Sequence, residues 1–198
     1  MRPLTLADVC DLHHYAQVRD AALARIIALK ATRRVPVGDL VTLVFENRAT
    51  VSFQVHEMVR IERITRATAV QAELDAYNGL LPDGRDLSAT CFLELTDPAT
   101  LAATLQRFRG LAEPGAVTLR LADHRVLPAE FAPGHGAAGR IAAVHALRFR
   151  FTDADIAWWR SGAGAAGLAI DLPDYRHHTR IDAATRRALA QDFADGPG

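Results

Sequence analysis

Residues 141–151 restrict the fold of this chain more than any other stretch, because their side chains alternate with a period of two. One face is apolar apart from a single histidine and consists of Ile141, Ala143, His145, Leu147, Phe149 and Phe151. Such alternation predicts a strand with one buried face. Further strand patterns occupy residues 40–45, 49–53, 87–95, 117–121, 125–131 and 168–172. Short polar turns predict hairpins at 46–48 and 122–124, so the sheet is expected to be mainly antiparallel.

Helical spacing of apolar residues marks other parts of the chain. Thr5 begins a capping-box pattern, which predicts a long N-terminal helix that ends near Thr32. Residues 54–64 and 69–77 predict a central helical segment with a bend between its two halves. Shorter helices are expected after Thr152 and Asp182. We therefore expect an α+β fold, a mainly antiparallel sheet packed on helices, in a single domain that spans residues 1–198.

Composition excludes several classes of protein. The 198 residues are 49% hydrophobic, enough to bury a sizeable core, and 23 basic residues balance 23 acidic ones. A chain without net charge has no overall field that attracts nucleic acid, so no nucleic-acid partner is expected. No apolar run is long enough to span a membrane, and the N-terminus lacks the pattern of a signal peptide. We therefore expect a cytoplasmic protein without membrane association.

Three glutamates and one histidine stand out because each interrupts an apolar pattern. Glu62 and Glu73 occupy helix positions where apolar residues are expected, and Glu57 lies at the edge of the apolar side. His145 lies in the middle of an apolar strand face. A buried carboxylate is costly unless it is paired, hydrogen-bonded or bound to a metal. These residues are therefore the candidates for a functional site.

Two interpretations of these residues stay open. In the first, the glutamates pair with nearby arginines such as Arg60 and Arg66, and the histidine is a hydrogen-bonded core residue. The second is a metal site made of Glu57, Glu62, Glu73 and His145. Carboxylate oxygens with one imidazole suit iron, manganese or zinc.

Motifs of known enzymes are absent or incomplete. His56-Glu57 begins like the H-E-x-x-H motif of zinc proteases, but Arg60 replaces the second histidine. The glycine-rich residues 132–140 match no phosphate-binding pattern. No G-x-S-x-G motif appears, and neither cysteine lies in a reactive setting. No catalytic residue and no organic cofactor is therefore assigned.

Several short segments together resemble one known family. They are Leu4-Thr5 with Asp8, Arg33-Arg34-Val35, VTLVFE at residues 41–46, residues 50–64 with their core EMVRIERI at 57–64, Glu73-Leu74 with Tyr77-Asn78, PDG at residues 82–84, AVH at residues 143–145, LRF at residues 147–149, and Tyr175. The set resembles the uncharacterised bacterial family that has number 3501 among the domains of unknown function. His56 departs from the glutamine expected there, so no site is built on it. Relatives tend to be encoded beside rubrerythrin-like and iron–sulfur oxidoreductase proteins, which implies a redox or peroxide-stress role and a partner of one of these kinds.

Three functions from different classes are compatible with these patterns. The one that the resemblance favours is an accessory or metal-handling protein of a redox or peroxide-stress pathway. The second is a non-catalytic interaction module that docks on an oxidoreductase or on a second copy of the chain. Such a module would expose an apolar patch, for which Trp158, Trp159 and Tyr175 are candidates. The third is an enzyme on a small organic substrate, with Glu57 or His145 as acid or base.

Overall fold

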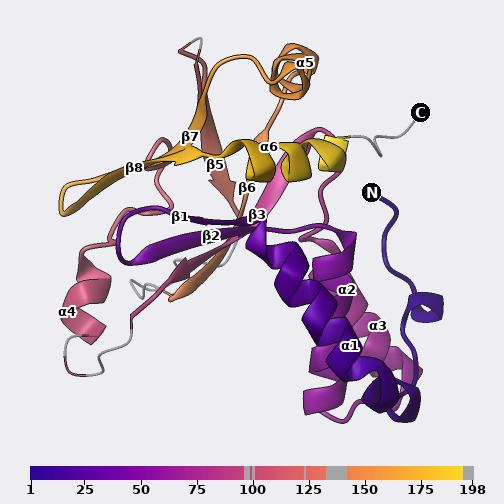
Figure 1. Ribbon diagram of the computed structural model, residues 1–198. Coiled ribbons are helices and arrows are strands. Elements are labelled where there is room, and N and C mark those ends of the chain that lie inside the picture. The colour runs from indigo at the N-terminus through magenta and orange to yellow at the C-terminus, as the bar shows by residue number, and fades with distance from the viewer. Residues whose placement is uncertain (96–98, 100, 123, 133–141, 194–198) are drawn as a thin grey trace.

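The computed structural model describes residues 1–95, 99, 101–122, 124–132 and 142–193. Eight strands in these residues form one sheet in the order β1-β2-β3-β6-β5-β4-β7-β8, and each neighbouring pair is antiparallel (Figure 1). The strands are β1 Arg34–Pro36, β2 Val41–Phe45, β3 Asp86–Leu93, β4 Val117–Leu121, β5 Val126–Phe131, β6 Val144–Arg150, β7 Ala166–Leu172 and β8 Tyr175–Ile181. The antiparallel sheet of an α+β fold is thus confirmed.

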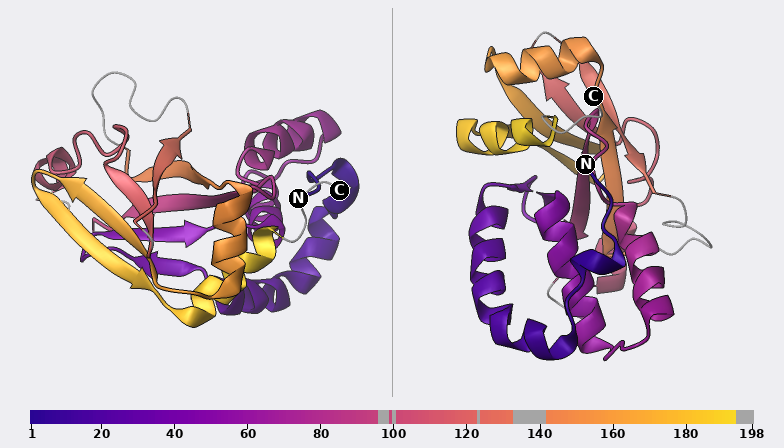
Figure 2. Two further views of the ribbon diagram at one scale, coloured as in Figure 1. Left: turned by 90° about the horizontal axis from the view of Figure 1, so that it is seen from above. Right: turned by 90° about the vertical axis from the view of Figure 1, so that its right-hand side faces the viewer.

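Most of the helices belong to an N-terminal group or a C-terminal group. The helices are α1 Leu12–Ala31, α2 Arg48–Ile61, α3 Ala67–Asn78, α4 Leu101–Gln106, α5 Asp153–Ser161 and α6 Ala183–Ala190, with 3-10 turns η1 Leu6–Asp8 and η3 Gln191–Phe193. Helices α1, α2 and α3 lie side by side at one end of the sheet and α5 lies at the other, whereas α6 lies between α5 and the N-terminal helices (Figures 1 and 2). No helix in the described part of the chain is long and apolar enough to cross a membrane.

The sheet is strongly curved, so that its first and last strands approach each other (Figure 2). Tyr175, at the start of β8, closes this gap. Its hydroxyl donates to the carbonyl oxygen of Val37 at 2.7 Å and accepts from the backbone N–H of Leu40 at 3.0 Å. Gly38 lies against this hydroxyl with φ +77°, and a Cβ at this position would collide with Tyr175 and His177. The closure therefore needs glycine at this turn.

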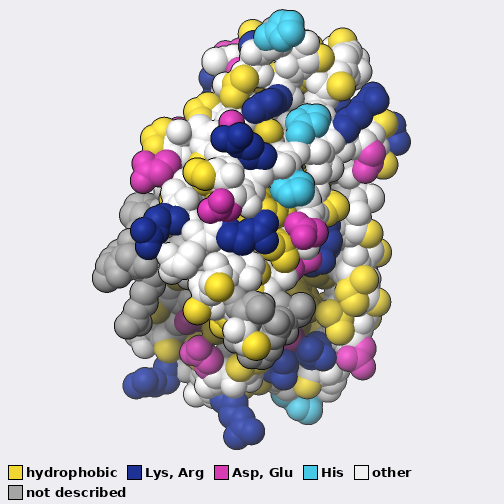
Figure 3. Space-filling view, turned by 90° about the vertical axis from the view of Figure 1, so that its left-hand side faces the viewer, with side chains coloured by type: hydrophobic (Ala, Val, Ile, Leu, Met, Phe, Trp, Pro, Cys, Tyr) yellow, Lys and Arg dark blue, Asp and Glu magenta, His cyan; other side chains and the backbone are white. Residues whose placement is uncertain are grey.

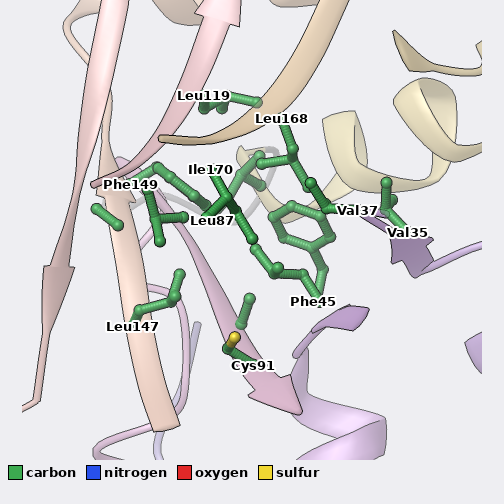
Figure 4. Packing of buried hydrophobic residues seen from close by; sticks show 14 of the residues in the cluster. Val35, Val37, Phe45, Leu87, Cys91, Leu119, Leu147, Phe149, Leu168 and Ile170 are labelled. Atoms are coloured by element: carbon green, nitrogen blue, oxygen red, sulfur yellow. The ribbon is translucent and has the colours of Figure 1, made fainter. Parts of the chain in front are cut away.

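The concave face of the sheet encloses the larger of two hydrophobic cores (Figure 4). Phe45 of β2, Leu87 of β3 and Phe149 of β6 lie in it, together with Leu168 and Ile170 of β7. These residues occupy alternate strand positions, which is why a period of two in the sequence marks the buried face.

A smaller core lies between α2 and α3, and Leu12 at the start of α1 packs against it. Its buried residues are Leu4, Val51, Val55, Val59, Val70, Leu74 and Leu81. The valines of α2 recur every four residues, and Val70 and Leu74 of α3 have the same spacing, so each helix presents one apolar stripe to the other. The bend expected between the two halves of the central segment is the turn between α2 and α3.

One predicted strand is wrong. Residues 49–53 form the first turns of α2, because Asn47 caps that helix. The side-chain oxygen of Asn47 accepts hydrogen bonds from the backbone N–H groups of Ala49 and Thr50, both at 3.0 Å. The predicted hairpin at 46–48 is therefore a turn from strand to helix.

The predicted N-terminal helix is interrupted. Thr5 caps only the short turn η1, and α1 begins after a second cap at Asp11, whose carboxylate accepts the backbone N–H of His14 at 2.9 Å. Of the glycine-rich loop at 132–140, all but Ala132 lies outside the described residues.

Candidate functional site

Glu57 of α2 points toward α1, and three side chains form hydrogen bonds with its carboxylate. Arg19 donates two hydrogen bonds at 2.9 Å, Arg60 donates two at 3.0 and 3.2 Å, and the Tyr15 hydroxyl donates one at 2.9 Å. The bonds from Arg19, and then those from Arg60 and Tyr15, outweigh burial and lower the pKa of Glu57 from 4.5 to about 2. This arrangement is the structural glutamate–arginine pairing that was one of the two interpretations.

Glu62 and Glu73 lie at the corner between α2 and α3. Glu62 is exposed and ends α2, and Glu73 is half-buried on α3. Burial, followed by the negative charges of Glu73 and Glu62, raises the pKa of Tyr77, so both carboxylates act on the same ring. The bend thus brings these two acids into one neighbourhood, but Glu62 is not on a buried stripe.

His145 lies elsewhere, on the concave face of β6. It is 2% exposed, stands opposite Cys91 of β3, and meets the ring of Phe131 edge-on with 5.8 Å between ring centroids. Burial raises the pKa of Cys91 to about 12, which keeps that neighbour a neutral thiol. Among the described residues, no three His, Cys, Asp or Glu side chains gather closely enough to hold a metal ion. The structure therefore does not assemble Glu57, Glu62, Glu73 and His145 into one site.

Glu46 is a buried carboxylate that the sequence patterns did not single out. Its donors are neutral: Thr90 of β3 at 2.7 Å, Gln54 of α2 at 3.0 Å, and the Thr50 hydroxyl. It is 1% exposed and ties two strands to the start of a helix. These hydrogen bonds give Glu46 a role in the stability of the fold.

A cavity with a distinctive charge lies between α5 and α6 and has a volume of about 690 Å³. Four arginines line it, namely Arg160, Arg180, Arg186 and Arg187, against a single acid, Asp182. The remaining lining is mostly apolar and includes Trp159, Ala165, Ala166, Ile181, Ala183 and Ala190. We call this cavity the arginine pocket. It combines positive charge with an apolar wall, the composition of a site for an anion with an apolar body.

The chain forms this pocket through one hairpin. Strand β7 pairs with β8 so that Ala166, at the start of β7, faces Ile181, at the end of β8. Helix α5 leads into the start of β7 and α6 leaves the end of β8, so the end of α5 and the beginning of α6 are neighbours. Each helix is capped locally: Thr152 and Asp155 form a capping box for α5, and Asp182 caps α6.

Arg186 is a buried residue of the pocket lining, and it pairs with no carboxylate in the described part of the chain. Its guanidinium donates to the carbonyl oxygens of Trp158 at 2.9 Å, Trp159 at 3.1 Å, Ala163 at 3.1 Å and Gly164 at 2.9 Å. It also lies over the ring of Trp158, 4.3 Å from the centroid. The arginine thus satisfies the carbonyl groups that a helix end leaves open, and burial lowers its pKa.

The other three arginines of the pocket are available to a ligand. Arg160, Arg180 and Arg187 are exposed, and none of them makes an ion pair within the residues that the structure describes. The one acid, Asp182, is occupied as a helix cap: it accepts from the backbone N–H of Thr185 at 2.8 Å and from the hydroxyl of Thr185 at 3.0 Å. The backbone N–H of Thr185 is the main cause that lowers the pKa of Asp182.

Elsewhere the charges are mixed. On the face shown in Figure 3, basic and acidic side chains alternate over the surface. Many of the arginines are paired, for example Arg148 with Asp86 at 2.6 Å and Arg48 with Asp8 at 2.7 Å. Against a chain whose formal net charge is zero, the arginine pocket is a local excess of positive charge.

Comparison with known proteins places the chain in a family. Residues 3–193 match the model of the family described as Protein of unknown function (DUF3501). The chain belongs to this family. A crystal structure of a protein of unknown function from Burkholderia pseudomallei K96243 has the same fold: it is 36% identical, with a TM-score of 0.90, over 96% of this chain and 99% of that one. No curated protein is significantly similar. The resemblance seen in the sequence is confirmed. In this DUF3501 member, the arginine pocket is the candidate functional site.

Sequence patterns did not indicate this pocket. Its arginines are scattered over two helices and a strand, and only the pair Arg186-Arg187 is adjacent in the chain. One signal was present: an arginine in the last turn of a helix, Arg160, precedes a glycine-rich loop where the helix carbonyl groups need donors.

Proposed function

We propose that this protein binds an organic anion in the arginine pocket. One observation carries the proposal: three exposed arginines that form no ion pair with a described residue line a single cavity, in which Asp182 is the one acid. Guanidinium groups bind carboxylate and phosphate oxygens in a planar, two-bonded geometry. Uncompensated positive charge around a cavity attracts such groups and raises their local concentration.

The size and lining of the pocket indicate what else the anion carries. A volume of about 690 Å³ lies in the usual range of cavities for small organic ligands. Trp159, Ile181 and several alanines provide apolar surface that a bare inorganic ion would leave uncovered. The ligand class is therefore a carboxylate or phosphate on an apolar body.

Binding without covalent chemistry fits the side chains present. The described lining contains no serine, cysteine, histidine, lysine or tyrosine, the residue types that commonly act as nucleophile or base. The one acid, Asp182, is held as a helix cap. These facts support a binding function over the enzyme considered from the sequence.

The redox and metal-handling role is supported only by the proteins that tend to be encoded beside members of the family. Its ligands would be iron, manganese or zinc, but the described residues gather no group of three suitable side chains. A rubrerythrin-like or iron–sulfur partner stays a prediction. An organic anion bound by an accessory protein is compatible with such a pathway.

The three side chains that were candidates for the apolar patch of an interaction module are buried or half-buried. Trp159 and Tyr175 are each 1% exposed, and Trp158 is covered by Arg186. The exposed large apolar residues are spread over the N-terminal helical region, with Leu6, Ile27 and Ile61, and over α4, β5 and β6, with Leu101, Val126 and Val144. Docking on another protein through these residues stays a prediction.

Tryptophan fluorescence tests the proposal, because the chain has two tryptophans: Trp159 lines the pocket, and the ring of Trp158 lies against the pocket residue Arg186. Hexyl phosphate and hexanoate are suitable probes. We expect at least one to change the fluorescence saturably, and the double variant Arg180→Gln with Arg187→Gln to bind it at least about tenfold more weakly.

A matched control is Arg66→Gln, an exposed arginine in the turn between α2 and α3, at the end of these helices that lies far from α5 and α6 (Figure 1). It should bind like the parent protein. Equal binding by the double variant, or no saturable binding of either probe at low salt, would contradict the proposal.

A further inference from the structure

A second group of basic side chains lies on the convex face of the sheet, next to the arginine pocket. In the register of the sheet, Arg120 of β4 stands opposite Gly167 of β7, and Gly167 stands opposite Arg180 of β8. Residues that are paired across antiparallel strands project from the same face. Two exposed arginines therefore flank a position without a side chain, with their Cα atoms roughly 10 Å apart at about 4.8 Å per strand.

His178 fills the space above this glycine. A Cβ at Gly167 would lie 2.6 Å from Nε2 of His178 and 2.9 Å from the carbonyl oxygen of Thr179. The imidazole edge therefore lies directly over the bare backbone between the two arginines. Glycine at this position leaves room that any other residue would occupy. We call Arg120, His178 and Arg180 the convex triad.

No acidic side chain in the described residues neutralises this triad. Arg120 makes one long contact, from Nε to the hydroxyl of Thr118 at 3.5 Å, and neither it nor His178 forms an ion pair with a described residue. By contrast, Arg176, which lies further toward the start of β8, forms an ion pair with Asp171 of β7 at 3.0 Å. Of the two arginines on this face of β8, Arg176 is thus neutralised by an acid, whereas Arg180 lies beside His178 and Arg120.

Arg180 belongs to both groups, since it also lines the arginine pocket. A ligand seated in the pocket against Arg160 and Arg187 therefore lies beside the convex triad. A ligand with one anionic group, bound in the pocket, would leave the positive charge of the triad without a counter-charge. A ligand with a second oxyanion group could bind the triad as well. Two linked sites increase affinity because the second contact is made at a high effective concentration.

We propose that the ligand is an elongated dianion, an organic molecule with an oxyanion group at each end. One end binds Arg160 and Arg187 in the pocket, and the other binds Arg120 and His178 over Gly167, with Arg180 between them. This inference rests on the proposed anion-binding function and names its ligand class. Phosphate and carboxylate ends share the required chemistry, and the experiment separates them.

The test compares matched pairs of probes that differ only in the second anionic end. Hexane-1,6-diol bisphosphate is compared with hexyl phosphate, and hexanedioate with hexanoate, by tryptophan fluorescence. We expect at least one dianion to bind about tenfold or more tightly than its monoanion. The pair with the larger ratio identifies the end group as phosphate or carboxylate.

Variants then locate the second end. Arg120→Gln with His178→Gln should reduce the ratio of dianion to monoanion affinity to about one and leave the monoanion affinity unchanged. Arg160→Gln with Arg187→Gln should weaken both probes. The control Arg176→Gln, on the same strand but paired with Asp171, should leave the ratio as it is.

The outcomes separate this inference from the function on which it rests. Monoanions and dianions that bind equally, with no effect of the Arg120 and His178 changes, would overturn the dianion and leave the anion-binding pocket standing. Absence of saturable binding by all four probes would overturn both. Thermal unfolding of each variant, expected to match the parent protein, shows that a lost affinity is not a lost fold.

Discussion

Trp159 and Arg186 hold each other by two hydrogen bonds that run in opposite directions. The indole Nε1 of Trp159 donates to the carbonyl oxygen of Arg186, and Nε of Arg186 donates to the carbonyl oxygen of Trp159, both at 3.1 Å. This reciprocal pair joins the end of α5 to the middle of α6. It fixes the distance between the two walls of the arginine pocket, so stability and pocket shape depend on the same two residues.

Replacement of this arginine should be among the most destabilising single changes outside the apolar cores. We expect Arg186→Met to lower the free energy of unfolding by about 3 kcal/mol, because several buried carbonyl groups lose their donor. Urea denaturation measures this change. The control is Arg187→Met, the next residue, which is exposed and should shift stability by less than about 0.5 kcal/mol. Equal effects of the two changes would contradict the role given to Arg186.

Glu57 should matter for stability and not for ligand binding. We expect Glu57→Gln to lower the free energy of unfolding by about 1 to 3 kcal/mol, because Arg19 and Arg60 lose their charged acceptor. The matched control is Glu62→Gln, at an exposed helix end, with a change within about 0.5 kcal/mol. Anion affinity in the arginine pocket should be the same in both variants. A Glu62 variant that is the less stable of the two would refute this assignment.

The same carboxylate predicts a pH dependence. Its pKa is lowered on folding from 4.5 to about 2, so the folded state binds fewer protons there than the unfolded state. Its contribution is fully present above about pH 4.5 and is lost as the pH falls toward 2. The difference in unfolding free energy between the parent protein and Glu57→Gln should therefore shrink over this interval. A difference that stays constant down to pH 2 would be inconsistent with the shift.

Tyr175 should control the closure of the curved sheet. We expect Tyr175→Phe to cost about 1 to 2 kcal/mol, because the backbone groups of Val37 and Leu40 lose their shared hydroxyl. Hydrogen exchange at the amide of Leu40 should accelerate more than exchange in the middle of β3. Uniform acceleration across both strands would mean that the hydroxyl contributes to global stability without a local role at the closure.

Removal of metal ions tests the metal site that the sequence suggested. We expect dialysis against a chelator to leave the unfolding temperature unchanged, because the described residues gather no set of three ligands. Mass spectrometry of the untagged protein and of Glu62→Ala measures the bound metal directly. Stoichiometric iron, manganese or zinc that disappears in the variant would contradict this expectation and support metal handling.

The strands that could be predicted are those with one buried face. Leu87, Ala89 and Cys91 on β3, and Leu147 and Phe149 on β6, follow the alternation and point into the core. Strand β8 was missed because its exposed positions carry arginine and histidine and its inward positions include half-buried polar residues, which hides the period of two.

Local competition explains the error at the start of α2. Val51 and Phe53 are residue types that favour strands, and they led to the prediction of a hairpin. The cap at Asn47 and the burial of Val51, Val55 and Val59 on one helical stripe outweigh that preference. The helices after Thr152 and Asp182 were predicted because their caps and apolar spacing agree.

The candidate site was beyond sequence reasoning for a physical reason. Whether an arginine is neutralised depends on which acid lies near it in space: Arg148 finds Asp86 from another strand, and Arg180 finds no acid in the described residues. Spacing along the chain contains no such information. The inward position of His145 was predictable, but the separation of Glu57 from it required the arrangement of the helices relative to the sheet.

All residues that line the arginine pocket fall in one continuous stretch of chain, from Trp159 to Ala190. The pocket is therefore assembled by contacts of short sequence separation, whose loop-closure entropy is small. Changes of length in the N-terminal helices or in the loops between β3 and β5 would leave its walls in place. An insertion in the hairpin between Ala166 and Ile181 would not, since that register brings the end of α5 beside the start of α6. Ligand preference in this architecture can thus change independently of the rest of the molecule.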